Sequence, residues 1–179
     1  MIITHIYSSL YRLNQYKVNI LSLYNIIINI IMGYKYGVWL VYNKSMFPTT
    51  HIGHFTITCY MEKKDAFSLY EDILAKYGKT HYIDVKGKKP IMFDENMYED
   101  DDNNMGSWGY EGNQCNWNNF KKCTNNYKCN FSDMPHTSVE YFKTNKVNPI
   151  EIDDSCVKCS LAVADITNDD PTKWNLLKK

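Results

Sequence analysis

The spacing of apolar residues predicts one clear helix and a series of short strands. Between Asp65 and Tyr77 the apolar positions follow the i, i+3, i+4, i+7 spacing of one helical face. Asp65 suits the N-cap of this helix, and Gly78 suits its end. We expect the continuous apolar face to pack on the sheet that carries residues 54–60. Aromatic and β-branched runs predict strands over 36–42, 54–60, 82–85, 91–93, 107–110, 136–142, 150–152 and 160–166.

Three later stretches depart from this pattern. Residues 94–131 begin with an acidic run and continue with Asn, Gly, Trp and Cys, so we expect a low-complexity insertion with parts as loop and 107–110 as the exception. The lysine-rich turn 86–90 is expected to be solvated, with phosphate contact as the alternative. Near the end of the chain, Asp170 as N-cap and Pro171 in the first turn predict a short last helix.

The apolar run 18–32 near the N-terminus is short for a membrane span, and it is interrupted by Asn19, Asn25 and Asn29. No small-residue cleavage site follows it, which argues against a signal peptide. The preferred interpretation is that the native domain starts at Met32 and covers 32–179, with 1–31 as an extension translated from upstream sequence. An appended helix is the alternative, and no membrane association is expected.

Charge and composition narrow the class of partner. The 179 residues include 20 basic and 20 acidic side chains, so the chain lacks the positive field that long duplex nucleic acid requires. A small nucleotide or short oligonucleotide is the expected partner, and a monomer is expected. Abundant Asn, Ile, Lys and Tyr indicate an AT-rich genome, such as that of a large DNA virus or a protist.

The main functional signal is a repeated His-x-Thr/Ser motif. His54 precedes Thr56 within one predicted strand, and His136 precedes Ser138 within another. Because side chains alternate across a strand, each histidine shares a face with its hydroxyl. If both strands line one groove, two imidazoles and two hydroxyls converge on a small volume.

This set of side chains suits the cleavage of a phosphodiester. One group must take a proton from the nucleophile while another gives a proton to the leaving oxygen, and histidine does either near neutral pH. Hydroxyls at Thr56 and Ser138 would donate to the non-bridging oxygens. The arrangement requires no metal and no other cofactor.

The paired motifs resemble those of the two-histidine (2H) phosphoesterase superfamily, in its LigT-like branch. The resemblance covers about 32–179, and the second motif departs from the family pattern at Pro135 and at polar Thr137. It implies an α+β fold with two lobes, each an antiparallel sheet with outer helices, around a central groove. It also implies hydrolysis of a 2′,3′-cyclic phosphate, a 2′-5′ oligoadenylate or a cyclic di- or oligonucleotide. For a viral relative, it further implies a location in the host cytoplasm and a role against host immune signalling.

Four aromatic residues are weaker candidates for the site. Trp39 and Tyr42 could stack on a base, although core packing is the alternative. In the family an aromatic near the groove often stacks on the nucleobase, and Trp108 or Tyr110 would supply it here. Two further histidines, His51 and His81, have no Thr or Ser two residues later. We therefore expect His51 to be a solvated loop residue, and His81 to be at the surface or hydrogen-bonded.

Two alternatives of other classes remain open. One is a non-catalytic nucleotide-binding or RNA-binding module of the same fold. The other is a zinc interaction module, because the chain has six cysteines, two of them in a Cys-x-x-Cys at Cys156 and Cys159. Free thiols are the default expectation because only that pair has the tight spacing of a zinc site.

Overall fold

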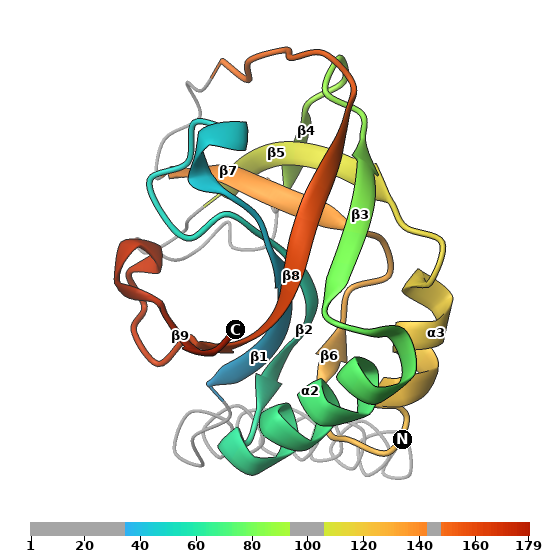
Figure 1. Ribbon diagram of the computed structural model, residues 1–179. Helices are drawn as coiled ribbons and strands as arrows, with labels where there is room; N and C mark the ends of the chain where they lie inside the picture. Colours follow the sequence, from blue (N-terminus) through green and yellow to red (C-terminus); the bar gives the residue numbers. More distant parts are fainter. Residues whose placement is uncertain (1–34, 94–105, 143–147) are drawn as a thin grey trace, which may run out of the picture. The chain divides into compact units, whose positions relative to one another are not determined.

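A computed structural model of the chain describes residues 35–93, 106–142 and 148–179. The described part is mixed α/β and is dominated by an antiparallel sheet with two α-helices (Figure 1). The predicted extension 1–31 and the acidic run 99–102 lie outside the described residues.

In the described ranges the sheet has nine strands, all of whose pairings are antiparallel. Its order is β4-β5-β3-β8-β1-β2-β6, with β7 paired to β5 and β9 paired to β8. The predicted strand 136–142 is confirmed as β7, and β1 and β2 match their predicted ranges to within one residue. The strands are β1 Tyr36–Val41, β2 His54–Met61, β3 Thr80–Val85, β4 Ile91–Phe93, β5 Gly106–Asn113, β6 Asn130–Phe131, β7 His136–Phe142, β8 Ser155–Asp165 and β9 Asn175–Lys178.

Helix α2 (Lys63–Tyr77) packs on the sheet beside β1 and β8, as its apolar face predicts. It buries Ala66, Leu69, Tyr70 and Ile73. The helix begins three residues earlier than an N-cap at Asp65 predicts, so Asp65 lies in the first turn and Glu62 is the N-cap. The end at Gly78 is confirmed, where φ of 77° is a left-handed conformation that glycine adopts without strain.

Strand β1 lies between β2 and β8 in the sheet, and both of its faces are covered by packed side chains. Val38 and Leu40 enter the main core under α2, whereas Trp39 and Val41 point to the other face. There they pack against alanines of β8 and against the half-buried Trp174 near the C-terminus. This second face carries the candidate site.

The expectation of an irregular insertion is wrong for most of 106–131. That segment forms β5, α3 (Trp117–Thr124) and β6. Trp117 and Phe120 of α3 are buried against the core, and α3 contacts α2 (Figure 1). A few apolar side chains at helical spacing suffice to anchor a segment whose other residues are polar.

Two predictions for the C-terminal part also need correction. Residues 150–152 form no strand, and β8 begins at Ser155, five residues before the predicted start. The last helix is only the 3-10 turn η2 (Pro171–Lys173), followed by β9. The cap itself is confirmed, because the Asp170 side chain accepts a hydrogen bond from the Thr172 backbone N–H.

The loop between β1 and β2 includes a second 3-10 turn, η1 (Lys44–Met46). Among the described residues, no helix is long and apolar enough to cross a membrane.

Candidate functional site

Both His-x-Thr/Ser motifs line one pocket of about 130 Å³. The first motif contributes from the start of β2 and the second from the start of β7. None of the described lining residues is acidic, which favours an anionic ligand. The lining comprises His54, Thr56, Phe93, Ser107, His136, Ser138 and Tyr141.

The short strand β6 brings the two motifs together. It pairs with β2 at Thr58 and Cys59, and the Ser132 backbone N–H donates to the Ile57 carbonyl at 3.0 Å. The chain then turns directly into β7, so that His136 begins its strand close to β2. Motifs that are distant in sequence therefore face one pocket.

Two glycines allow the close approaches at this point. A Cβ on Gly53 would lie 2.3 Å from the Tyr42 ring, and a Cβ on Gly109 would lie 1.8 Å from the Thr137 carbonyl oxygen. Gly53 immediately precedes His54, and Gly109 is opposite Ser138 in the β5–β7 register. A larger residue at either position would push a motif strand away from its neighbour.

His54 is buried, with 5% of its surface exposed. Its ring stacks on Trp39 with 3.7 Å between ring centroids and 12° between planes. The Nδ1 atom lies 2.7 Å from the Ile52 carbonyl oxygen. Burial lowers the pKa of His54 to about 3, an effect that the Ile52 carbonyl opposes and the neighbouring His51 and His136 reinforce. His54 is therefore neutral at physiological pH.

His136 is half-buried and packs against Phe93, with ring centroids 4.6 Å apart. Its Nδ1 atom lies 3.3 Å from the Met134 carbonyl oxygen and 3.2 Å from Ser132 Oγ. Ser132 donates its own hydrogen to the Met134 carbonyl, which leaves its oxygen free to accept from the ring.

The two histidines thus share one local arrangement, in which Nδ1 lies near the carbonyl oxygen of the residue two positions earlier. A carbonyl only accepts, so Nδ1 of each neutral ring carries the proton. In neutral His54 the lone pair is therefore on Nε2. No sequence pattern predicts this contact between Nδ1 and a backbone carbonyl.

Ser107 adds a third hydroxyl that sequence reasoning missed. It is 3% exposed, and its Oγ lies 3.3 Å from Ser138 Oγ. With Thr56 and Ser138, it brings three hydroxyl groups from three strands to the pocket. Ser107 belongs to no sequence motif, and the aromatic residues beside it carry the stronger sequence signal.

Phe93 and Tyr141 also line the pocket and were not predicted. Strict alternation from His136 and Ser138 would have turned Glu140 toward the pocket. The β5–β7 register instead shifts between Ser138 and Glu140, so that Val139 is an extra residue in β7. Beyond this bulge Glu140 accepts a hydrogen bond from Trp108 Nε1, and Tyr141 faces the pocket.

The departures of the second motif have structural explanations. Thr137 is 1% exposed, and its hydroxyl lies 2.7 Å from the hydroxyl of Tyr42. Pro135 is buried, and its carbonyl accepts from the Gly112 backbone N–H. Thr137 and Pro135 are therefore both buried, with the Thr137 hydroxyl and the Pro135 carbonyl hydrogen-bonded.

The four predicted aromatic residues lie outside the pocket lining. Trp39 lies beneath His54, and Tyr42 is buried in the main core. Trp108 and Tyr110 are also buried in that core, so the prediction that they face the groove needs correction. Tyr110 donates to the Ile150 carbonyl.

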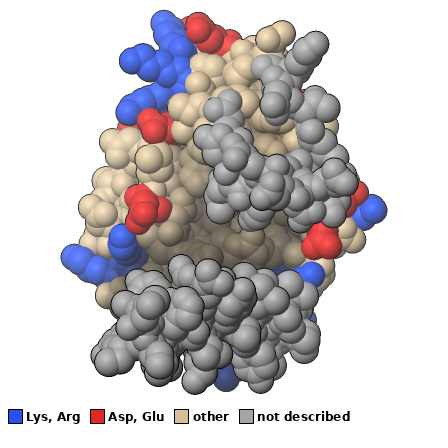
Figure 2. Space-filling view, turned by 180° about the vertical axis from the view of Figure 1, so that it is seen from behind, with Lys and Arg blue, Asp and Glu red and all other residues tan. Residues whose placement is uncertain are grey.

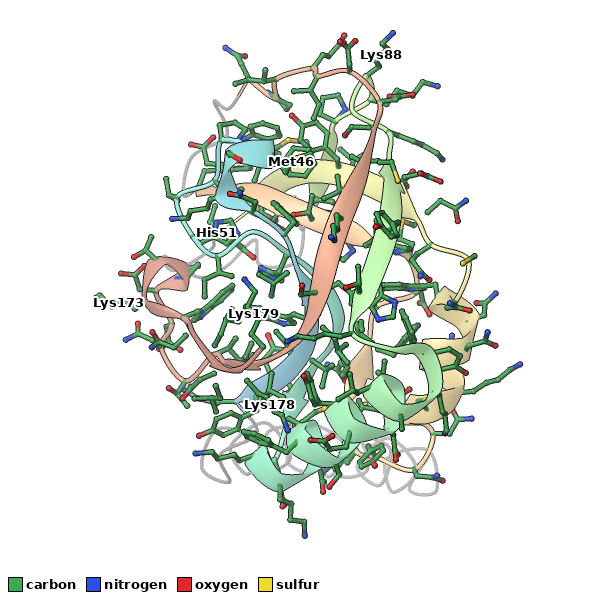
Figure 3. The ribbon with its side chains drawn as sticks, in the orientation of Figure 1. Met46, His51, Lys88, Lys173, Lys178 and Lys179 are labelled. Atoms are coloured by element: carbon green, nitrogen blue, oxygen red, sulfur yellow. The ribbon has the colours of Figure 1, made fainter. Side chains whose placement is uncertain are left out.

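The prediction that His51 is a solvated loop histidine is wrong, because only 2% of its surface is exposed. His81 is buried as well, with Nε2 3.0 Å from the Gly78 carbonyl, which matches the expectation of a hydrogen-bonded histidine. Lys88 lies at the top of the view and His51 at its left (Figure 3), and the turn 86–90 contributes no residue to the pocket lining.

All six cysteines lie in the described residues as free thiols. Cys156 is exposed and Cys159 is buried, because residues three apart on a strand point to opposite faces. One metal ion could not bind both. Within 35–93, 106–142 and 148–179, no group of three or more His, Cys, Asp or Glu side chains is arranged to hold a metal ion.

On the face opposite to that of Figure 1, acidic and basic side chains are interspersed over the visible described surface (Figure 2). This agrees with the balanced charge of the sequence. No protein-family model, no curated protein and no solved structure matches the chain.

Proposed function

We propose that the protein is a metal-independent phosphodiesterase of the two-histidine type that cleaves a small nucleotide. The observation that carries this proposal is the convergence of His54, Thr56, His136 and Ser138 on one pocket. The shared carbonyl contact at Nδ1 supports it, since it would direct proton transfer in both rings to Nε2. The absence of acidic residues from the described lining favours a phosphate group.

In this proposal His54 is the general base and His136 is the general acid. His54 is neutral, so its Nε2 lone pair can accept a proton from an attacking water, and an anionic phosphate bound beside it would raise the pKa of the ring toward the working pH. Water adds to phosphorus, the bond to the leaving oxygen breaks, and protonated His136 supplies the proton that this oxygen needs. Thr56 and Ser138 donate to the non-bridging oxygens as negative charge builds.

The finer fold belongs to the same proposal. The strands β4, β5 and β7 would form one lobe, the remaining strands would form the other, and the pocket would be the groove between them. The candidate substrates are 2′,3′-cyclic phosphates, 2′-5′ oligoadenylates and cyclic oligonucleotides. If the source is viral, we propose a monomer in the host cytoplasm that removes nucleotide signals of host immunity.

A substrate panel in the presence of a chelator tests the activity. We expect turnover of at least one of the three substrate classes in EDTA. His54→Ala and His136→Ala should each lower kcat by about 10² to 10⁴-fold, the usual contribution of general acid or base catalysis. Circular dichroism should show that both variants remain folded.

Three results would contradict the proposal. Full activity in either variant would exclude the assigned roles. Loss of activity in EDTA that zinc or manganese restores would exclude the metal-independent mechanism. Binding of a nucleotide without any turnover would instead support the non-catalytic binding module.

A further inference from the structure

A third histidine, His51, lies between the two halves of the site. It belongs to the loop that leads into β2, on the same side of the sheet as the C-terminal segment (Figure 3). Its ring centroid is 5.8 Å from that of His54 and 5.1 Å from that of Tyr141. His51 therefore contacts the catalytic histidine of β2 and a pocket residue of β7 at once.

The polar ring is an unusual choice for this buried position. Within the described part of the chain, neither nitrogen of His51 makes a hydrogen bond of good geometry. A buried polar group without a partner costs free energy, and a phenylalanine ring of similar shape would avoid that cost. Packing alone therefore does not explain a histidine here.

The electrostatic surroundings of the ring point to the backbone of Ser138 as the missing partner. Burial and Lys44 lower the pKa of His51 to about 4, while a backbone group of Ser138 opposes this effect. A group that favours the protonated ring must be an acceptor, which makes it the Ser138 carbonyl. Among the side chains of the described residues, only the Thr137 hydroxyl donates a hydrogen bond to this carbonyl, and that bond is long at 3.5 Å.

We propose that His51 is a positioning residue, whose ring N–H donates to the Ser138 carbonyl when a phosphate group occupies the pocket. Hydrogen bonds around a site are often long or misaligned without ligand and shorten when ligand binds. The bond would join the loop before the first motif to the second motif, and so hold His54 and Ser138 around one anion. This inference rests on the proposed function.

Nuclear magnetic resonance of the ring nitrogens in the full chain tests the bond directly, with inorganic phosphate as the probe. We expect phosphate to shift the His54 and His136 signals and to slow hydrogen exchange at the His51 ring N–H. The His81 signals should stay unchanged. Shifts at His54 and His136 without any change at His51 would overturn the inference and leave the proposed function standing. If no histidine responds to phosphate, both fail.

Two variants separate hydrogen bonding from packing. His51→Phe keeps the ring and loses the donor, so the Kd for phosphate should rise about fivefold to tenfold, the usual effect of one hydrogen bond. His51→Gln keeps an N–H donor and should remain within about twofold of the unaltered protein. His81→Phe is the matched control, a buried histidine outside the pocket lining, and it should not affect phosphate binding. Equal phosphate affinity in His51→Phe and the unaltered protein would overturn the inference.

Discussion

Acid should destabilise this fold well before its carboxylates titrate, because two histidines are buried in the neutral form. Burial lowers the pKa of His54 to about 3 and that of His51 to about 4, against 6.5 for an exposed ring. Between these values and pH 6.5 the unfolded chain binds protons that the folded chain does not. The folded protein therefore keeps its full free energy of unfolding above pH 6.5, and this free energy decreases as the pH falls toward the pKa values of the folded state.

The size of the effect follows from the same pKa values. At pH 5 an unfolded histidine is almost fully protonated, which lowers the free energy of unfolding by about 2 kcal/mol for each ring that stays neutral in the folded state. His54 and His51 together account for about 4 kcal/mol, a large part of the 5–15 kcal/mol of a typical domain. Burial also lowers the pKa of His81, which adds to the loss in the same direction.

Urea unfolding at pH 7.5 and pH 5.0 measures this difference, and His51→Phe isolates one ring. We expect the free energy of unfolding to fall by about 4 kcal/mol or more in the unaltered protein, and by about 2 kcal/mol less in the variant. At pH 7.5 the variant should be at least as stable, since it buries no unpaired nitrogen. An equal fall in both proteins would refute the conclusion that His51 is buried and neutral.

Two further predictions concern the first motif and the chain boundary. Thr56→Val should lower kcat by about tenfold to a hundredfold, because it removes a hydrogen-bond donor to the phosphate. Thr58→Val, two residues along the same strand, is the control and should leave steady-state rates unchanged. The buried hydroxyl of Thr58 has no hydrogen-bond partner in the described residues and lies outside the pocket lining. Equal effects of the two substitutions would contradict the role of Thr56. A chain of residues 32–179 should give a cooperative melt and full activity, because residues 35–179 form a compact unit; insolubility would show that 1–31 cover part of the core.

The sequence predicted the elements whose signal is local. The apolar face of α2, the stop at Gly78, the motif strands β2 and β7 and the Asp170 cap depend on residues close together in the chain. The four motif residues were found because strand alternation gives His54 and Thr56, and likewise His136 and Ser138, a common face.

The remaining site residues depend on pairings that no local pattern encodes. Tyr141 reaches the pocket only because of the bulge at Val139, and Ser107 only because β5 pairs with β7. The burial of His51 depends on Trp174 and Tyr141, which are far from it in sequence. The composition of 94–131 did not predict α3, because three buried apolar residues of that helix, Trp117, Phe120 and Cys123, outweigh the polar residues around them.

The carbonyl contacts at Ile52 and Met134 have a consequence for how the site tolerates change. In many enzymes a second side chain selects the tautomer of a catalytic histidine, and one substitution can remove it. Here the peptide backbone itself provides the acceptor to Nδ1 of both rings. The side chains at 52 and 134 can then vary without altering the proton position, provided that the turn before each strand keeps its shape. The position of the proton on each ring is therefore set by the backbone conformation before β2 and β7.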